Sequence, residues 1–293
     1  MTVLITGGTG LVGSHVIAEV LARGERVRTL SRRPDTSALP ADVEVVAGSL
    51  SDTAAMRTAL DGVDGLFLLS PVSLDELTGS LQTLDLARAA GVEAVVYLSV
   101  IHADIFTDPP HFAAKAAVEK AMADFGIHAT VLRPGIYLQN DLALRDRLIH
   151  DGVYDPPVGN AAALFTDVGD LAEVAAAELL RRLAAPAAPA VTLDVVAPQI
   201  LGGDRIAEIW SAILGRQIRY GGDDLDRMEA TFAGILPNWL AYDLRLMYRR
   251  FQRDGMIAAP GTDQRLKEIL GRPMRSYTEF ARETAESWKA VHA

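Results

Sequence analysis

Short apolar runs alternate with longer amphipathic segments over the first two-thirds of the chain. The apolar runs are rich in β-branched and aliphatic residues and are bounded by glycine, proline or charged residues, which is typical of buried strands. They predict strands at Thr2–Thr6, Arg26–Leu30, Val43–Ala47, Gly65–Leu69, Ala94–Ser99 and Ala129–Arg133. Segments with helical spacing separate them, at Leu11–Ala22, Thr53–Leu60, Leu74–Ala90 and Phe112–Phe125. Apolar strands joined by helices predict a parallel sheet covered on both faces, and therefore a doubly wound α/β fold.

The pattern changes after the sixth predicted strand. A further helix, Leu171–Leu183, and a strand, Ala190–Val196, are joined by a Pro/Ala-rich stretch. Helical segments dominate from there on, at Asp204–Leu214, Asp224–Gly234, Trp239–Arg253, Asp263–Leu270 and Tyr277–Ala290. We therefore expect a sheet domain over residues 1–196 and a mainly helical C-terminal substrate lobe over residues 197–293. The lobe holds all three tryptophans, which would pack in its core or line a substrate pocket: Trp210, Trp239 and Trp288.

Composition narrows the function classes. The chain has 28 Lys and Arg against 38 Asp and Glu, a net charge of −10, which argues against a nucleic-acid partner. It has no Cys, and its six His form neither an HExxH motif nor a close pair, so we expect no protein-bound metal. Apolar runs are too short to span a membrane, and the first residues lack a charged leader, so we expect no membrane partner and a cytoplasmic location.

The strongest chemical signal is a glycine-rich turn between the first predicted strand and the first predicted helix. It reads Thr6-Gly7-Gly8-Thr9-Gly10-Leu11-Val12-Gly13. Gly7 would permit the tight turn, Gly10 would let a pyrophosphate approach the backbone, and Gly13 would allow close packing of helix against strand. The free amides at the helix N-terminus would then bind the pyrophosphate. We therefore expect a Rossmann-type dinucleotide site that includes Thr9, Leu11 and Val12.

The residues after the second and third strands bear on the choice of cofactor. Arg32 and Arg33 stand where a site specific for NAD would place an acidic residue on the ribose 2′-hydroxyl. A guanidinium there can bind a 2′-phosphate, so we expect NADP(H) to be preferred over NAD(H), although two solvated arginines would give the same pattern. Ser49 and Leu50 would flank the adenine, whereas Asp52 would either join them or cap the next helix.

These residues also carry a family resemblance. The segments TGGTGLVG, LSRRP, GSLSD, LFLLSP, YLSV and KAAVEKAMADFGIHATVLRPGIYLQN resemble the atypical short-chain dehydrogenases of the NmrA-like group, as do FTDVGDLAEVAAAELL and LGRPMRSYTEFARETAESW later in the chain. That group contains NADPH-dependent quinone and triphenylmethane dye reductases, relatives of the isoflavone reductases, and redox-sensing regulators with little turnover. The resemblance covers nearly the whole chain and implies the fold, but it leaves the reaction open.

The resemblance also implies catalytic positions and shows one departure. The wider superfamily has a Ser at the end of the fifth strand, matched by Ser99, and then a Tyr-x-x-x-Lys motif, of which Lys115 matches the lysine. His111 stands in place of the tyrosine. Lys115 would bind the ribose of the nicotinamide half, or else reach solvent or pair with Glu119. His111 would donate a proton or else cap the helix.

Two further loops complete the predicted site. Ser70 and Pro71 follow the fourth strand, where family members pass the backbone beside the nicotinamide. Pro134 and Ile136 follow the sixth strand, where the family's backbone covers the carboxamide, and Tyr137 would reach the substrate or pack on an apolar wall.

Two functions remain open at this point. The first is an NADPH-dependent reductase that transfers hydride to a small apolar acceptor such as a quinone, a dye or an activated double bond. Such acceptors fit the absent tyrosine, because a delocalised product anion can take its proton from water. The alternative is a nucleotide-binding redox sensor with little or no turnover. An isomerase or epimerase fits less well, and a homodimer or a regulatory protein partner is compatible with either main hypothesis.

Overall fold

The structure is a computed structural model that describes residues 1–32 and 39–290. The chain divides into two compact units. Each unit is made of three segments, and the segments of the two units alternate along the sequence. Unit 1 comprises residues 1–104, 111–134 and 168–195, and unit 2 comprises residues 105–110, 135–167 and 196–293. The sequence suggested a single boundary after residue 196, whereas the segment 135–167 groups with the C-terminal part of the chain.

Unit 1 is built on a parallel sheet of seven strands within the described residues, in the order β10-β6-β5-β4-β1-β2-β3. The strands are β1 (Thr2–Ile5), β2 (Arg26–Ser31), β3 (Glu44–Ala47), β4 (Gly65–Leu68), β5 (Ala94–Leu98), β6 (Thr130–Pro134) and β10 (Val191–Val195). Each coincides with a predicted strand to within one or two residues. The predicted α/β fold is confirmed.

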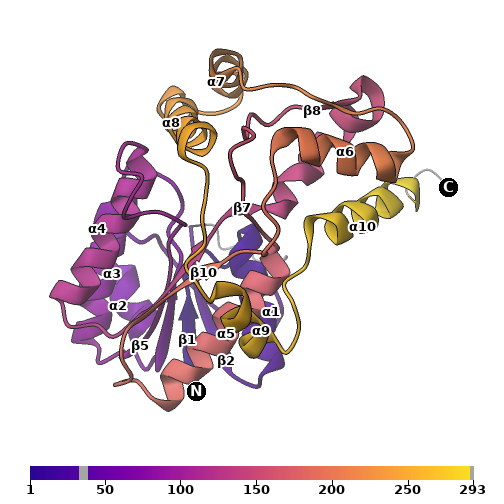
Figure 1. Ribbon diagram of the computed structural model, residues 1–293. Coiled ribbons are helices and arrows are strands. Elements are labelled where there is room, and N and C mark those ends of the chain that lie inside the picture. The colour runs from indigo at the N-terminus through magenta and orange to yellow at the C-terminus, as the bar shows by residue number, and fades with distance from the viewer. Residues whose placement is uncertain (33–38, 291–293) are drawn as a thin grey trace. The chain divides into compact units, whose positions relative to one another are not determined.

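Helices cover both faces of this sheet (Figure 1). They are α1 (Leu11–Ala22), α2 (Thr53–Leu60), α3 (Glu76–Ala89), α4 (Pro110–Asp124) and α5 (Val168–Ala184). On one face, α2, α3 and α4 bury residues such as Met56, Leu84 and Met122 against Leu66 and Tyr97 of the sheet. On the other face lie α1 and α5, which pack against each other. Burial on both sides explains why the strands are continuously apolar.

The sheet reverses its strand order at β1, which pairs with β2 on one side and β4 on the other. Ligands of doubly wound sheets bind beyond the carboxyl ends of the strands at such a point. The loops that follow β1, β2, β3 and β4 all end at this edge, because the strands are parallel.

Unit 2 has shorter strands than unit 1 and consists mainly of helices (Figure 1). It contains β7 (Ile136–Tyr137), a 3₁₀ helix (Leu138–Leu144), a π-helical turn (Arg147–Asp151), β8 (Val153–Tyr154), β9 (Phe165–Thr166), α6 (Gly203–Leu214), β11 (Arg219–Tyr220), α7 (Leu225–Ala233), α8 (Asn238–Asp254), α9 (Thr262–Leu270) and α10 (Tyr277–Ala290). The long helices match the predicted ones. The two-residue strands were not predicted, because two residues are too few to show a period.

The core of unit 2 is aromatic and contains a polar chain of bonds. Trp210 stacks on Trp288 with ring centroids 5.3 Å apart, and its indole Nε1 donates to the hydroxyl of Tyr277 at 2.9 Å. That hydroxyl in turn donates to the buried carboxylate of Asp141. Trp210 and Trp288 therefore belong to the core, while Trp239 is half-buried at the start of α8.

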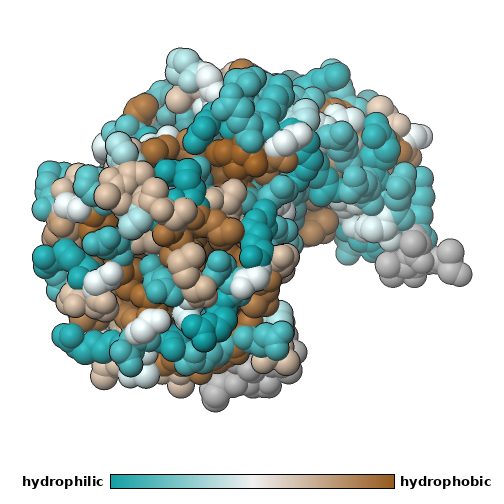
Figure 2. All heavy atoms as spheres, turned by 90° about the horizontal axis from the view of Figure 1, so that it is seen from below, coloured by the Kyte–Doolittle hydropathy of each residue, from teal (hydrophilic) through white to brown (hydrophobic). Residues whose placement is uncertain are grey.

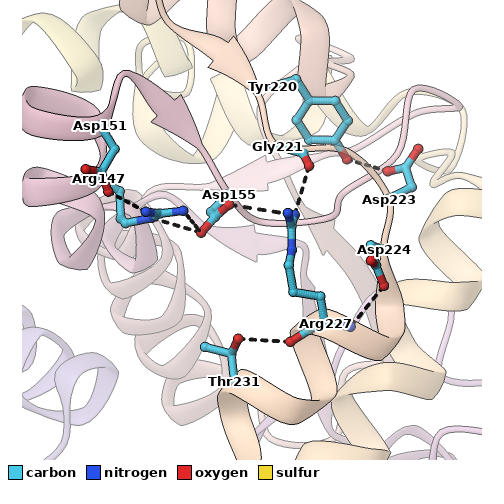
Figure 3. Close-up of polar contacts among 9 residues, drawn as sticks. All are labelled: Arg147, Asp151, Asp155, Tyr220, Gly221, Asp223, Asp224, Arg227 and Thr231. Atoms are coloured by element: carbon cyan, nitrogen blue, oxygen red, sulfur yellow. Dashed lines mark hydrogen bonds and ion pairs between the residues drawn. The ribbon is translucent and has the colours of Figure 1, made fainter.

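A second polar cluster of unit 2 joins the π-helical turn to α7 (Figure 3). Asp155 accepts two bonds from Arg147, at 3.0 and 2.7 Å, and lies 3.8 Å from Arg227. Arg227 also donates to the carbonyl of Gly221 at 2.8 Å, and Asp224 caps α7 by accepting from the amide of Arg227. One carboxylate thus ties together segments that are far apart in the sequence.

Hydrophobic and hydrophilic residues are interspersed over the face shown in Figure 2. Large exposed apolar side chains such as Leu74 and Ile235 are scattered along the chain. In the part of the chain that the structure describes, no helix combines the length and the apolar character that crossing a bilayer requires.

Candidate functional site

A cavity of about 490 Å³ opens in unit 1 at the carboxyl ends of β1 to β4. It is lined by Thr6, Gly7, Thr9, Gly10, Leu30, Ser31, Arg32, Gly48, Ser49, Leu50, Leu69, Pro71, Val72, Ser73, Asp75 and Glu76. The cavity therefore brings together the glycine turn, the arginine after β2 and the segment after β3, as a dinucleotide site requires.

The glycine turn has the geometry that its residue types suggest. Gly7 has a φ of +68°, which a side chain would strain, and the amide of Gly10 donates to the carbonyl of Gly7 at 2.9 Å. A Cβ added at Gly13 would lie 2.2 Å from that same carbonyl oxygen, so only glycine lets α1 start this close to the turn. Gly10 is the N-cap of α1 and has no side chain to occupy the first-turn amides. They are available to an anion.

The loop after β4 is held against this turn by one threonine. The hydroxyl of Thr6 accepts from the amide of Leu69 and donates to its carbonyl, at 2.8 Å each. This places Leu69 and Pro71 in the cavity wall. Ser70 lies between them but has its hydroxyl 2.6 Å from that of Ser80 on α3, so its side chain is bonded into the fold.

The other end of the cavity is formed by the loops after β2 and β3. Arg32, Ser49 and Leu50 all line it, and the amide of Gly48 donates to the carbonyl of Ser31 at 3.0 Å. Arg33 lies outside the described residues. Asp52 caps α2 by accepting from the amides of Ala54 and Ala55 at 3.1 and 3.0 Å, so the capping role is confirmed.

Two adjacent carboxylates at the start of α3 also line the cavity, and sequence reasoning missed both. Asp75 is exposed and accepts from the hydroxyl of Ser73 at 2.7 Å; this bond and the charge of Arg32 both act to lower its pKa. Glu76 is 3% exposed. Their position in the sequence could have revealed them, because they lie at the start of α3, the helix that follows β4, and β4 is the strand next to β1.

Glu76 forms a buried ion pair with Lys115. The ammonium Nζ lies 2.8 Å from the carboxylate oxygen Oε1, and Lys115 is only 7% exposed. The same ammonium is 3.5 Å from the carbonyl of Leu98 and 5.9 Å from the ring centroid of Tyr97. Burial raises the pKa of Tyr97, and the negative charges of Glu76 and Glu119 raise it further, so its hydroxyl stays protonated.

Glu119, the alternative partner considered for Lys115, is engaged elsewhere. Its carboxylate accepts from Arg133 Nε at 3.0 Å and from the hydroxyl of Ser99. Arg133 also pairs with Asp104 at 2.9 Å. Ser99 therefore lies in a charged cluster at the ends of β5 and β6, next to the Lys115 pair but with a different carboxylate.

His111 lies in the first turn of α4, after Pro110. Its side chain is buried and meets the ring of Phe112 edge-on, with centroids 4.7 Å apart. It shares the buried face of α4 with Lys115, Val118 and Met122, as the spacing predicted. The catalytic role of His111 stays a prediction.

The remaining predicted residues do not line the cavity. Among them, Leu11 is exposed and Val12 and Pro134 are buried in unit 1. Ile136 and Tyr137 belong to unit 2, where β7 pairs with β9 and both residues are half-buried. Their predicted contacts with cofactor or substrate stay predictions.

Comparison with known proteins places the fold and the glycine turn in one family. A model described as the NmrA-like family matches residues 1–273. An NAD(P)H azoreductase of Xenophilus azovorans is 27% identical over 99% of this chain and 100% of its own length. A (4-alkanoyl-5-oxo-2,5-dihydrofuran-3-yl)methyl phosphate reductase of Streptomyces griseus is 30% identical over 98% of this chain and 99% of its own length.

A solved structure of a further reductase has the same fold as this chain. The NADPH-dependent quinone oxidoreductase of Escherichia coli, complexed with NADPH, superposes with a TM-score of 0.81 at 26% identity and covers 99% of this chain and 100% of its own. The resemblance inferred from the sequence motifs is therefore confirmed.

Proposed function

The chain belongs to the NmrA-like family, and from this premise we propose that it is an NADPH-dependent reductase that transfers hydride to a small apolar acceptor such as a quinone, a dye or an activated double bond. The observation that carries the proposal is the cavity at the carboxyl ends of β1 to β4, which unites the glycine turn with Arg32. The relatives named as an azoreductase and a quinone oxidoreductase support the oxidoreductase class.

The residues of the cavity fit a nicotinamide dinucleotide phosphate. The uncapped amides at the start of α1 would bind the pyrophosphate, and Gly10 puts no side chain in the way of its approach. Arg32, with Ser31 and Ser49 beside it in the wall, would bind the 2′-phosphate. The cofactor supplies the hydride when bound.

The chain's own contribution to the reaction is orientation and shielding. Lys115 and Glu76 would form the polar wall at the β4–β5 side, where a dinucleotide that crosses the switch point places its nicotinamide half. Reduction of a carbonyl would need a proton donor, and the position of the family tyrosine is held by the buried His111. Quinones and dyes make a smaller demand, because their reduced anions are delocalised and take protons from water.

The proposal is tested by mixing the protein with NADPH and a panel of quinones, azo dyes and triphenylmethane dyes, and following the absorbance of the reduced nicotinamide. We expect turnover that is lost in Lys115→Ala while NADPH still binds. Lys120→Ala is the matched control, because Lys120 is an exposed lysine on the same helix that pairs with Asp124, four residues after it. Tight cofactor binding without turnover on any acceptor would favour the redox-sensing alternative, and absence of binding would refute both.

A further inference from the structure

We propose that Glu76 sets the preference of this site between oxidised and reduced cofactor by cancelling the charge of Lys115. The inference rests on the proposed function, since it assumes a nicotinamide cofactor in the cavity of unit 1. It concerns a residue that forms part of the cavity wall and is the ion-pair partner of Lys115.

The first step is the location of the pair. Arg32 follows β2 and Lys115 follows β5, so the two cationic side chains stand on opposite sides of the switch point at β1. A dinucleotide whose 2′-phosphate lies at Arg32 extends across β1 toward β4 and β5. Its nicotinamide half therefore comes to the side of the cavity that is lined by Glu76, the ion-pair partner of Lys115.

The second step is charge. The oxidised nicotinamide ring carries a formal positive charge, whereas the reduced ring is neutral. A lone ammonium beside the ring would repel the oxidised form only, and a lone carboxylate would attract it. The pair of Glu76 and Lys115 is neutral as a whole, and its 2.8 Å separation keeps the two charges together in a buried setting where they are poorly screened by salt.

The third step is the contrast with the neighbouring residue. Asp75 carries the same charge and lines the same cavity, but it is exposed and accepts its hydrogen bond from Ser73. The charge near Asp75 is that of Arg32, at the adenosine end. Water screens the charge of the exposed Asp75, and the phosphates near Arg32 are identical in the oxidised and reduced cofactors, so Asp75 should act on both forms nearly equally. The effects of Asp75 and Glu76 on cofactor binding can therefore be measured separately, although the two residues are consecutive.

The measurement is the ratio of two dissociation constants, for NADP⁺ and for NADPH, determined by titration of the purified full-length protein at one pH and ionic strength. We expect Glu76→Gln to raise the ratio of the NADP⁺ constant to the NADPH constant by about tenfold or more, because one unit charge about 12 Å away is worth a factor of about ten at an effective dielectric constant of about 20, and a nearer charge is worth more. Lys115→Met should lower the ratio, and the double variant Glu76→Gln/Lys115→Met should return it to the wild-type value.

Two control variants separate this effect from a structural one. Glu76→Asp keeps the charge and should keep the ratio, and Asp75→Asn should keep it too, even if both constants change. A structural role for Glu76 would weaken both forms together and leave the ratio unchanged in Glu76→Gln, which would overturn the inference. If Glu76→Gln does not fold, an unchanged ratio in Lys115→Met overturns it instead. Wild-type protein that binds neither form would refute the proposed function itself.

Discussion

The hydroxyl of Thr6 and the backbone of Leu69 make two reciprocal hydrogen bonds, each 2.8 Å long, which join the end of β1 to the loop after β4. We expect Thr6→Val to keep the side-chain shape and lose both bonds. The amide and carbonyl of Leu69 would then be unpaired beside the glycine turn, at a cost of about 1–3 kcal/mol in unfolding free energy. Cofactor binding should weaken as well, because Leu69 lines the cavity.

Urea unfolding and cofactor titration check this expectation. Thr58→Val is a suitable control, because Thr58 is an exposed threonine on α2 whose hydroxyl donates to the carbonyl of Ala54 in the same helix. Its effect should stay within about 0.5 kcal/mol. Equal losses in the two variants would contradict the role assigned to Thr6.

Arg32 gives a prediction on cofactor choice. Replacing it with Glu should weaken NADPH binding ten- to hundredfold, the factor that corresponds to a lost charge-assisted pair of about 1.5–3 kcal/mol, and should leave NADH binding much less affected. Calorimetric titration of both cofactors measures the difference. Arg88→Glu, a charge reversal on the exposed side of α3, should change neither. A parallel loss for NADH and NADPH would mean that Arg32 does not read the 2′-phosphate.

The strands, helices and glycine turn could be predicted from the sequence because they depend on local signals. An apolar strand or an amphipathic helix can be recognised within about ten residues of sequence. The turn around Gly7 can be recognised because it needs particular residue types at a fixed spacing. The partner of Lys115 could not be predicted in this way. Helix geometry favours Glu119, four residues away, but Glu76 lies 39 positions earlier and reaches Lys115 only through the packing of α3 beside α4.

The residues that make up unit 2 could not be predicted from the sequence either. Residues 135–167 follow β6 directly, and the sequence pattern predicts that they belong to the sheet domain, yet they group with residues 196–293. Their strands are two residues long, and they join that unit through scattered side chains such as Asp141 and Asp155. A contact made by one side chain leaves no period in the sequence.

Arg182 gives a prediction on stability. It is a fully buried arginine near the end of α5, where it donates to the carbonyls of Ala129, Ala188 and Pro189 at 2.9, 2.6 and 2.8 Å. Burial lowers its pKa. Arg182→Met would fill most of the volume but remove these bonds and the one to the hydroxyl of Thr130. Of the three carbonyls, only that of Ala129 keeps a backbone donor within the described residues, the amide of Val191. We therefore expect unfolding free energy to fall by about 3 kcal/mol or more.

Chemical denaturation of wild-type protein, Arg182→Met and Arg88→Met provides the comparison. Arg88 is exposed and pairs with Asp85 three residues before it, so its loss should cost less than about 1 kcal/mol. The predicted role of Arg182 fails if Arg182→Met is as stable as Arg88→Met.

The buried carboxyl of Asp141 makes the stability of the protein depend on pH. Burial raises its pKa from 3.8 to about 7, although hydrogen bonds from Tyr277 and Tyr154 act to lower it. Between these two values the folded state keeps a proton that the unfolded state has lost, so this group makes unfolding free energy fall as pH rises from about 4 to about 7. Below that range both states are protonated and above it both are ionised, so the contribution is constant.

Asp141→Asn isolates this effect, because an amide has no proton to lose in this range. A shift of about three pKa units corresponds to at most about 4 kcal/mol, so the stability of Asp141→Asn relative to wild type should rise by up to that amount between pH 4 and pH 7. Urea unfolding at each pH gives the difference, and Asp146→Asn, on a highly exposed aspartate nearby, should give a nearly flat one. If the stability of Asp141→Asn relative to wild type stays flat or falls as pH rises, Asp141 is ionised in the folded protein over this range. The hydroxyl of Tyr277 would then donate to a buried, charged carboxylate, and the hydrogen bonds to that carboxylate would outweigh the cost of its burial.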